Sequence, residues 1–247
     1  MRCIQMFTKK HIHLLLNKMT TEHKHSSWSD SLKINQIGTW YQNNRKNANM
    51  GLVGLLVLVA GVVYYFNFYK PGREKEAASA LFMSERYFEK DSMNLVLKGD
   101  GKYPSAVDVA DEYGNTKAGN LAKFYAGRAF MSKKDFKSAL NYLEDAEFTD
   151  EIMAAVVIGL TGDCQSELGE TEKAAETYMK AATKRDNLFT SPLYLMKAGL
   201  HFEEAKNYEA AVKAYTTIRD KYKESQQAQF SAKYIARAST SMGKSPE

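Results

Sequence analysis

An uncharged and strongly apolar stretch extends from Asn47 to Tyr69 in this chain of 247 residues. A helix of about 20 residues rises roughly 30 Å, which is the thickness of the hydrocarbon core of a bilayer. About ten Leu, Val and Phe residues, at about −0.3 to −0.6 kcal/mol each, contribute on the order of −3 to −6 kcal/mol to membrane insertion. The apolar residues surround the whole helix, whereas a helix of a globular protein keeps a polar face toward water. The sequence therefore predicts a transmembrane helix over residues 47–69.

The segment before this helix is basic. Residues 1–46 contain eight Lys or Arg residues and two acidic ones, Glu22 and Asp30, and are too long for the n-region of a signal peptide. No small-residue cleavage site follows the apolar stretch, so we expect an uncleaved anchor preceded by a disordered basic arm. Met19 offers an alternative start, which would omit residues 1–18.

The positions of Lys and Arg bear on the orientation of the anchor. The 20 residues before Asn47 contain three of them, and the 20 residues after Tyr69 contain four. This short-range count slightly disfavours a cytoplasmic N-terminus, whereas the basic arm as a whole favours one. We expect a cytoplasmic N-terminus, although charge alone leaves both orientations open.

Three glycines lie near one face of the predicted span, namely Gly51, Gly54 and Gly61. Small residues allow a second helix to approach closely, so this face is a candidate helix-docking stripe. The alternative is that these glycines reflect only the high frequency of Gly in transmembrane helices.

After residue 70, small and large residues recur at fixed spacing. In three stretches a Gly is followed 12 residues later by Ala and four residues after that by Leu or Tyr: Gly127, Ala139 and Leu143; Gly162, Ala174 and Tyr178; Gly199, Ala211 and Tyr215. The period is 35 and then 37 residues. Small residues allow the two helices of a hairpin to approach, and the larger side chain fills the gap to the next hairpin. The pattern predicts an all-α solenoid of three repeats over residues 118–225.

Local signals place the other elements. We expect a linker helix and an atypical first helical unit over residues 70–117, with a helix over 74–91, a turn over 99–104 and a short helix over 105–113. A capping helix and tail are expected over residues 226–247. Asp150 is expected to cap a helix that begins at Glu151, Gly169 to end that helix, and Ser191 with Pro192 to begin a later one.

The spacing resembles that of tetratricopeptide repeats (TPR), although the first repeat has Lys133 and Lys134 where Gly is usual. Residues 74–241 also resemble the periplasmic domain of the YfgM family, ancillary subunits of the bacterial SecYEG translocon. The stretches that carry this resemblance are Arg86-Tyr-Phe-Glu-Lys-Asp-Ser92, Asp111-Glu-Tyr-Gly-Asn-Thr-Lys-Ala-Gly-Asn120, Lys197-Ala-Gly199 and Tyr234-Ile-Ala-Arg237. The long arm of residues 1–46 departs from the family.

The resemblance implies a single-pass protein of the bacterial inner membrane, with a cytoplasmic N-terminus and a periplasmic TPR domain. It further implies partnership with the SecYEG translocon and with a PpiD-like membrane-anchored peptidyl-prolyl isomerase chaperone.

The sequence contains no catalytic signature. It has no phosphate-binding loop, no H-E-x-x-H motif and no G-x-S-x-G motif, and the repeats contain a single histidine, His201. We therefore expect no enzyme activity, no cofactor, no metal site and no small-molecule substrate. Cys164 is expected to act as a small apolar residue near the packing seam. Two H-x-H pairs in the arm are a weak metal signature: His11, His13, His23 and His25.

Charge argues against a nucleic-acid partner. Residues 47–247 contain 26 basic and 27 acidic residues, so the main body of the protein lacks the excess of positive charge that nucleic-acid binding requires.

The functional surface is expected on the concave side of the solenoid, formed by the first helix of each hairpin. The residues expected on this surface are Leu121, Phe124, Arg128 and Met131 from the first repeat, Val156, Gly159 and Asp163 from the second, and Leu193, Met196, Leu200 and Glu203 from the third. These residues are mostly apolar and predict a groove for an amphipathic helix or an extended segment. The alternative is that they pack against neighbouring helices.

We interpret the chain as a non-enzymatic translocon accessory that holds chaperone and isomerase partners near emerging polypeptides, with unfolded clients as further candidate ligands. Two other interpretations stay open. One is a generic TPR adaptor of another envelope assembly, such as secretion or division machinery. The other is an organelle import receptor whose repeats face the cytosol.

Overall fold

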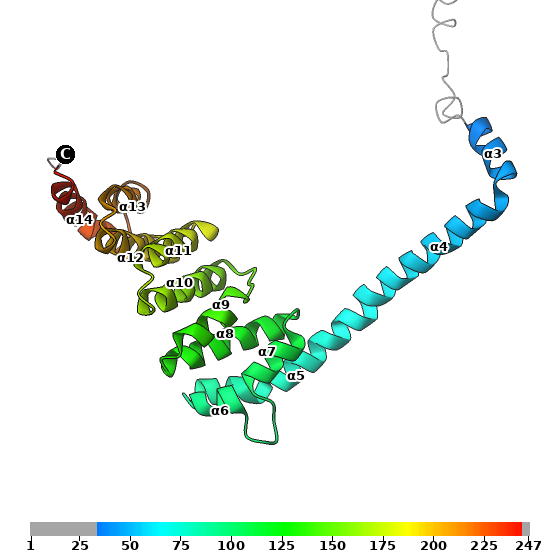
Figure 1. The fold of residues 1–247 in the computed structure, drawn as a ribbon, viewed down its shortest axis with the longest axis horizontal. Coiled ribbons are helices and arrows are strands. Elements are labelled where there is room, and N and C mark those ends of the chain that lie inside the picture. The colour runs from blue at the N-terminus through cyan, green and yellow to red at the C-terminus, as the bar shows by residue number, and fades with distance from the viewer. Residues whose placement is uncertain (1–33, 244–247) are drawn as a thin grey trace, which may run out of the picture. The chain divides into compact units, whose positions relative to one another are not determined.

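The computed structural model describes residues 34–243, and every regular element in that range is a helix (Figure 1). In chain order the helices are α3 (Ile34–Asn43), α4 (Arg45–Tyr64), the π-helix η1 (Tyr65–Tyr69), α5 (Lys70–Glu89), α6 (Met93–Lys98), α7 (Ala106–Tyr113), α8 (Lys117–Ser132), α9 (Phe136–Glu144), α10 (Glu151–Glu167), α11 (Thr171–Lys184), α12 (Thr190–Glu204), α13 (Tyr208–Lys221) and α14 (Ala228–Ser241). The expected arm up to residue 33, including Met19 and both histidine pairs, lies outside the described residues. The chain divides into two units between Tyr65 and Phe66.

The first unit contains α3 and α4. The two helices are joined at Asn44, whose amide Nδ2 donates a hydrogen bond to the carbonyl of Trp40 at 3.1 Å. No residue of α4 is buried. Within the described residues, one helical segment is long and apolar enough to cross a membrane: it lies in Arg45–Glu89, and its most apolar window has a mean hydropathy of 2.0. Gly51, Gly54 and Gly61 all face open space.

The second unit is built from helices that pack in sequence. The hairpins are α5 with α6, α8 with α9, α10 with α11, and α12 with α13, and α14 packs on α13. Successive hairpins contact one another through α9 with α10 and α11 with α12. Figure 1 shows this succession from α10 to α14. The expected all-α fold of pairwise-packed helices is confirmed.

The four hairpins share one turn geometry. Each turn has one residue in the left-handed region, namely Asp91, Lys134, Gly169 or Lys206, with φ of 55°, 61°, 79° and 62°. The next residue, which caps the second helix, has φ between −84° and −89° and ψ between 56° and 74°. The capping residue donates its backbone N–H to the carbonyl five residues earlier, the bond that closes a Schellman motif. The repeat signal therefore extends to a fourth hairpin, α5–α6.

This fourth hairpin was not predicted because α6 has only six residues and because Ser84, Val96 and Asp100 replace the repeat Gly, Ala and large residue. Residues 99–104, where a turn is expected, are non-helical and bend at residues 101–103. Helix α7 begins with a reciprocal capping box between Ser105 and Asp108.

Within the hairpins, the expected small-to-large contacts are present. A Cβ built on Gly199 would lie 2.3 Å from the ring of Tyr215, one on Gly162 would lie 2.8 Å from Tyr178, and one on Gly127 would lie 2.6 Å from Leu143. The large side chains of the last two hairpins also reach the next helix. Tyr178 stacks on Tyr194 with ring centroids 6.3 Å apart. The large side chain thus packs against the glycine of its own hairpin and, in the last two hairpins, against an aromatic ring of the next helix.

The helix ends agree with the sequence at two points and differ at a third. Asp150 accepts hydrogen bonds from the first-turn N–H groups of α10, and Gly169 follows its C-terminal cap with φ of 79°. The prediction that Ser191 caps a helix is wrong, because α12 begins at Thr190. Asn187 instead accepts from the N–H groups of Phe189 and Thr190, while Ser191 donates its hydroxyl to the Ala182 carbonyl at 2.7 Å.

Candidate functional site

The predicted groove residues lie on α8, α10 and α12, the first helices of three successive hairpins. Only three of them are exposed: Arg128, Leu193 (40%) and Leu200 (38%). Gly159 is buried beneath the ring of Tyr194, where it allows α12 to approach α10. The others are half-buried: Leu121, Phe124, Met131, Val156, Asp163, Met196 and Glu203. The open apolar surface is therefore concentrated on α12.

On α8, the groove residues face the first hairpin. Leu121 and Phe124 pack against a cluster that includes side chains of α5, α6 and α7. The Phe124 ring lies 6.2 Å from Phe88 of α5 and 6.4 Å from Phe148, which precedes α10. Phe124 thus serves as packing between hairpins, as the alternative interpretation of the groove expects.

Three of the predicted residues meet at one cavity. Arg128 and Met131 of α8 and Asp163 of α10 line a cavity of about 430 Å³. The first and second helices of the hairpins also contribute Ser132, Phe136, Ser166, Glu167 and Tyr178. Asp91 comes from the turn between α5 and α6, and Met93 is the first residue of α6. The cavity combines two methionines and a phenylalanine with acidic side chains and one arginine, so it suits a segment of mixed polarity.

Asp163 organises the polar side of this cavity. Its Oδ1 accepts hydrogen bonds from the Tyr178 hydroxyl and from the Lys197 ammonium, both at 2.6 Å. The Lys197 ammonium also lies 5.2 Å from the centre of the Tyr178 ring. Burial, together with the hydrogen bond to Asp163, raises the pKa of the Tyr178 hydroxyl, so this phenol remains a neutral donor at physiological pH. The three side chains connect α10, α11 and α12.

A similar arrangement recurs one hairpin later. Glu203 accepts from the Tyr215 hydroxyl at 2.7 Å and receives Arg237 of α14 through two hydrogen bonds of 2.7 and 2.9 Å. Burial and the Glu203 contact raise the pKa of Tyr215, and the bond to Glu203 raises that of Arg237. Tyr178 and Tyr215 are 37 residues apart, which is the repeat period. The acidic groups of the predicted groove are therefore neutralised within the fold.

A serine and a histidine also meet beside the cavity. Ser166 Oγ lies 2.8 Å from His201 Nε2, and His201 Nδ1 lies 2.9 Å from the carbonyl of Lys197. Because the carbonyl can only accept, Nδ1 carries a proton, and in the neutral ring Nε2 therefore accepts from the serine hydroxyl. Acyl transfer also requires N–H donors that face the developing oxyanion, and the backbone N–H groups around Ser166 are engaged within α10. The pair joins α10 to α12.

Cys164 lies in the seam as predicted. It is fully buried, and burial raises the pKa of its thiol to about 12, so the reactive thiolate is not populated at neutral pH. In residues 34–243 no group of three or more His, Cys, Asp or Glu side chains is placed to hold a metal ion.

No known protein family and no curated protein matches this chain.

The cavity includes residues that the sequence did not reveal. Asp91 and Met93 were missed because the α5–α6 hairpin was missed. Ser166 and Tyr178 lie four and 16 residues after the repeat glycine Gly162. The repeat spacing alone could therefore have placed them near the contact between the two helices of this hairpin.

Proposed function

We propose that this chain is a non-enzymatic, single-pass membrane-anchored TPR scaffold, and that it serves as an ancillary subunit of the SecYEG translocon. One observation carries the proposal. A helix of 20 residues without any buried residue, α4, shares the chain with four helix hairpins, the last three of which are consecutive. An apolar helix of this length is stable when lipid surrounds it, whereas stacked hairpins form binding surfaces in water.

The identical turns support the assignment of the hairpins to TPR units. The turns of α8–α9, α10–α11 and α12–α13 recur after 35 and then 37 residues, and in each of these hairpins a repeat glycine contacts a large side chain. The turn of α5–α6 precedes that of α8–α9 by 43 residues, because α7 lies between these two hairpins. We assign α14 as the helix that caps the array.

The Sec partnership rests on the sequence resemblance. Several residues that carry it make contacts between repeats, such as Lys197 with Asp163 and Arg237 with Glu203. The resemblance therefore supports a shared architecture, and the proposal extends it to the partners. The proposed location is the bacterial inner membrane, with a cytoplasmic N-terminus and the repeats in the periplasm beside a PpiD-like isomerase chaperone.

The proposed mechanism is mass action. A single anchor confines the repeats to the membrane surface, which raises the effective concentration of partner and client toward the mM range for a short tether. Leu193 and Leu200 form an exposed apolar stripe on α12. This stripe would hold a partner helix or an extended client segment.

The proposal is tested by capturing the full-length chain from gently solubilised membranes and quantifying the subunits that accompany it. Translocon subunits and an isomerase chaperone are expected in reproducible amounts. Replacing Leu193 and Leu200 with Glu is expected to reduce chaperone recovery about tenfold, because each charge lies in the apolar stripe. Phe82→Glu is the matched control, since Phe82 is an exposed apolar residue of α5 outside the stripe.

Two results would count against the proposal. Recovery of another envelope complex in place of the translocon would favour the generic adaptor. Equal recovery with the stripe variant and the control would contradict the role of α12.

A further inference from the structure

The loop between α11 and α12 exposes two large apolar side chains. Leu188 is 68% exposed and Phe189 is 80% exposed, more than any other large apolar residue in the described part of the second unit. Most exposed apolar residues at a protein surface are isolated and carry no function. This pair differs because of the way in which its backbone is held and because of the charges beside it.

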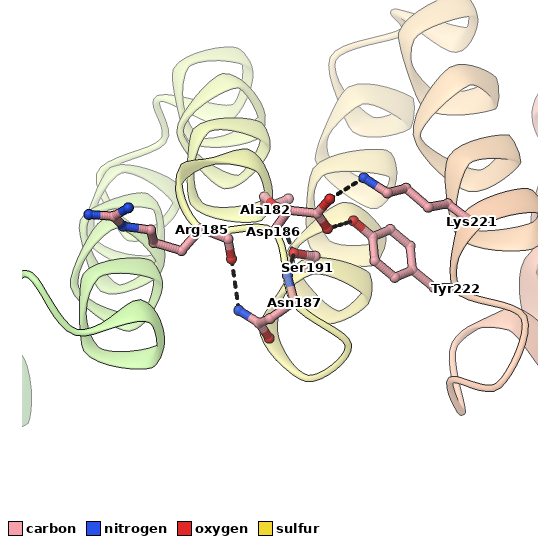
Figure 2. A network of polar contacts seen from close by, with 7 residues as sticks. All are labelled: Ala182, Arg185, Asp186, Asn187, Ser191, Lys221 and Tyr222. Carbon is pink, nitrogen blue, oxygen red and sulfur yellow. Dashed lines mark hydrogen bonds and ion pairs between the residues drawn. The ribbon is translucent and has the colours of Figure 1, made fainter.

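The loop backbone is fixed by a network of hydrogen bonds, shown in Figure 2. Asp186 accepts from the Lys221 ammonium and from the Tyr222 hydroxyl at the end of α13. Asn187 donates its side-chain amide to the carbonyl of Arg185 at 2.8 Å, and its backbone N–H donates to Ser191 Oγ at 3.0 Å. The loop is thus attached to α11, α12 and α13 at once.

The two apolar residues are the part of the loop whose side chains take no part in this network. Phe189 contributes only its backbone N–H, which donates to Asn187 Oδ1 at 2.9 Å. A rigid loop that presents an aromatic side chain has already lost the conformational entropy that binding would otherwise cost. Such preorganised aromatic anchors are typical of residues that dominate the energy of protein–protein interfaces.

The charges beside the tip are cationic. Lys184 and Arg185 are exposed and form no ion pair with any described residue, whereas Asp186 is neutralised by Lys221. In Figure 2 the Arg185 guanidinium extends away from the Asp186 carboxylate. A partner that covers the tip would therefore gain from acidic side chains around an apolar pocket.

We propose that Leu188 and Phe189 form an anchor that inserts into an apolar, acid-rimmed pocket of a folded partner protein. A bilayer surface would also accept apolar and cationic side chains. A fluid surface requires no particular loop shape, however, whereas a pocket does, so the fixed backbone favours a partner with a complementary shape. The anchor precedes the exposed residues of α12, since Phe189 is the N-cap of that helix and Leu193 lies one turn later. The inference holds whichever membrane assembly this chain joins.

The test uses the full-length chain in its native membranes, with photoreactive p-benzoylphenylalanine in place of Phe189. The expected product is an adduct with one protein, and the cross-linked peptide is expected to be apolar and flanked by Asp or Glu. The double variant Lys184→Glu/Arg185→Glu is expected to reduce adduct yield about tenfold, since charge at an interface rim governs association. The same photoreactive residue at Phe82, exposed on α5, is the matched control and is expected to be insensitive to that charge reversal.

Four outcomes would overturn the proposal: a phospholipid adduct, an adduct with a second copy of this chain, an adduct whose yield the charge reversal leaves unchanged, or no adduct. The variants are expected to retain the wild-type thermal unfolding curve, because the replaced side chains are exposed and make no side-chain hydrogen bond. Phe189→Ser, made in parallel, is expected to abolish binding of the partner so identified while leaving that curve unchanged.

Discussion

Replacement of Gly199 by Ala tests the packing on which the repeat array depends. The added Cβ would lie 2.3 Å from Cε1, 2.5 Å from Cζ and 2.9 Å from Cδ1 of Tyr215. An ordinary contact begins near 3.4 Å, so the ring must move by about 1 Å. The ring is buried, stacks on Tyr234 at 5.2 Å and donates its hydroxyl to Glu203. Moving it therefore disturbs the contacts that hold α14.

The magnitude follows from three contributions. Overpacking a buried site costs about 1 to 3 kcal/mol, and weakening a hydrogen bond to a charged group costs about 1.5 to 3 kcal/mol. The change from Gly to Ala within a helix recovers about 1 kcal/mol. We expect Gly199→Ala to lower the free energy of unfolding by about 1.5 to 5 kcal/mol. Gly162→Ala is expected to cost less, since its nearest Tyr178 atom lies at 2.8 Å.

The assay is urea unfolding of the full-length chain in detergent, followed by far-ultraviolet circular dichroism. Gly72→Ala is the matched control, because a Cβ there meets nothing within 4 Å, and it is expected to be neutral or to stabilise by up to about 1 kcal/mol. In a Tyr215→Leu background, Gly199→Ala is expected to cost less than about 1 kcal/mol, since the rigid ring is gone. If Gly199→Ala were as harmless as Gly72→Ala, the account of hairpin packing would be refuted.

Three further results are expected from the same unfolding assay. Lys206 adopts φ of 62° where the equivalent turn has Gly169, so Lys206→Gly is expected to stabilise by about 0.5 to 1 kcal/mol and Gly169→Ala to destabilise by a similar amount; a loss of stability in Lys206→Gly would contradict the shared turn geometry. Gln165 is buried and its Oε1 has no hydrogen-bond partner among the described residues, so Gln165→Met is expected to raise the free energy of unfolding by about 1 kcal/mol, and a loss would show that the amide is satisfied. The hydrogen bonds from Lys221 and Tyr222 hold the pKa of Asp186 below its usual 3.8, so its ionised form stabilises the fold above that pKa and loses this effect as the pH falls through the lower folded-state value. The stability difference between wild type and Asp186→Asn is therefore expected to shrink as the pH falls from about 5 through 3.8 and below, and a difference independent of pH would refute this assignment.

Much of the fold could be predicted from the sequence because its signals are local. The spacing from Gly199 to Tyr215 reports the distance between the two helices of one hairpin, and the same spacing occurs twice earlier in the chain. The apolar stretch over residues 47–69 needs only length and composition to be recognised. The α5–α6 hairpin could not be found in this way, because Ser84, Val96 and Asp100 occupy the positions of the repeat Gly, Ala and large residue.

The site was less predictable, since it depends on contacts between repeats. The helical frame places Phe124 and Leu200 on equivalent faces, yet Phe124 is covered by Phe88 and Leu200 is exposed. The difference arises because the first hairpin, which the sequence did not reveal, packs against α8. The Ser191 cap was predicted from a frequent dipeptide, whereas the cap that forms depends on Asn187, whose role follows from the loop conformation.

The membrane-anchored arrangement is tested most directly by the side of the membrane on which two cysteines react. Cys3 precedes α4, and Glu172, exposed on α11, follows it and can be replaced by Cys. Cys164 is expected to stay unlabelled on either side, because it is buried and the pKa of its thiol is raised to about 12. In sealed spheroplasts, an impermeant maleimide is expected to label E172C and to label Cys3 only after permeabilisation. Labelling of both cysteines in sealed spheroplasts, or of Cys3 alone, would contradict a single span that holds the repeats outside the cytoplasm.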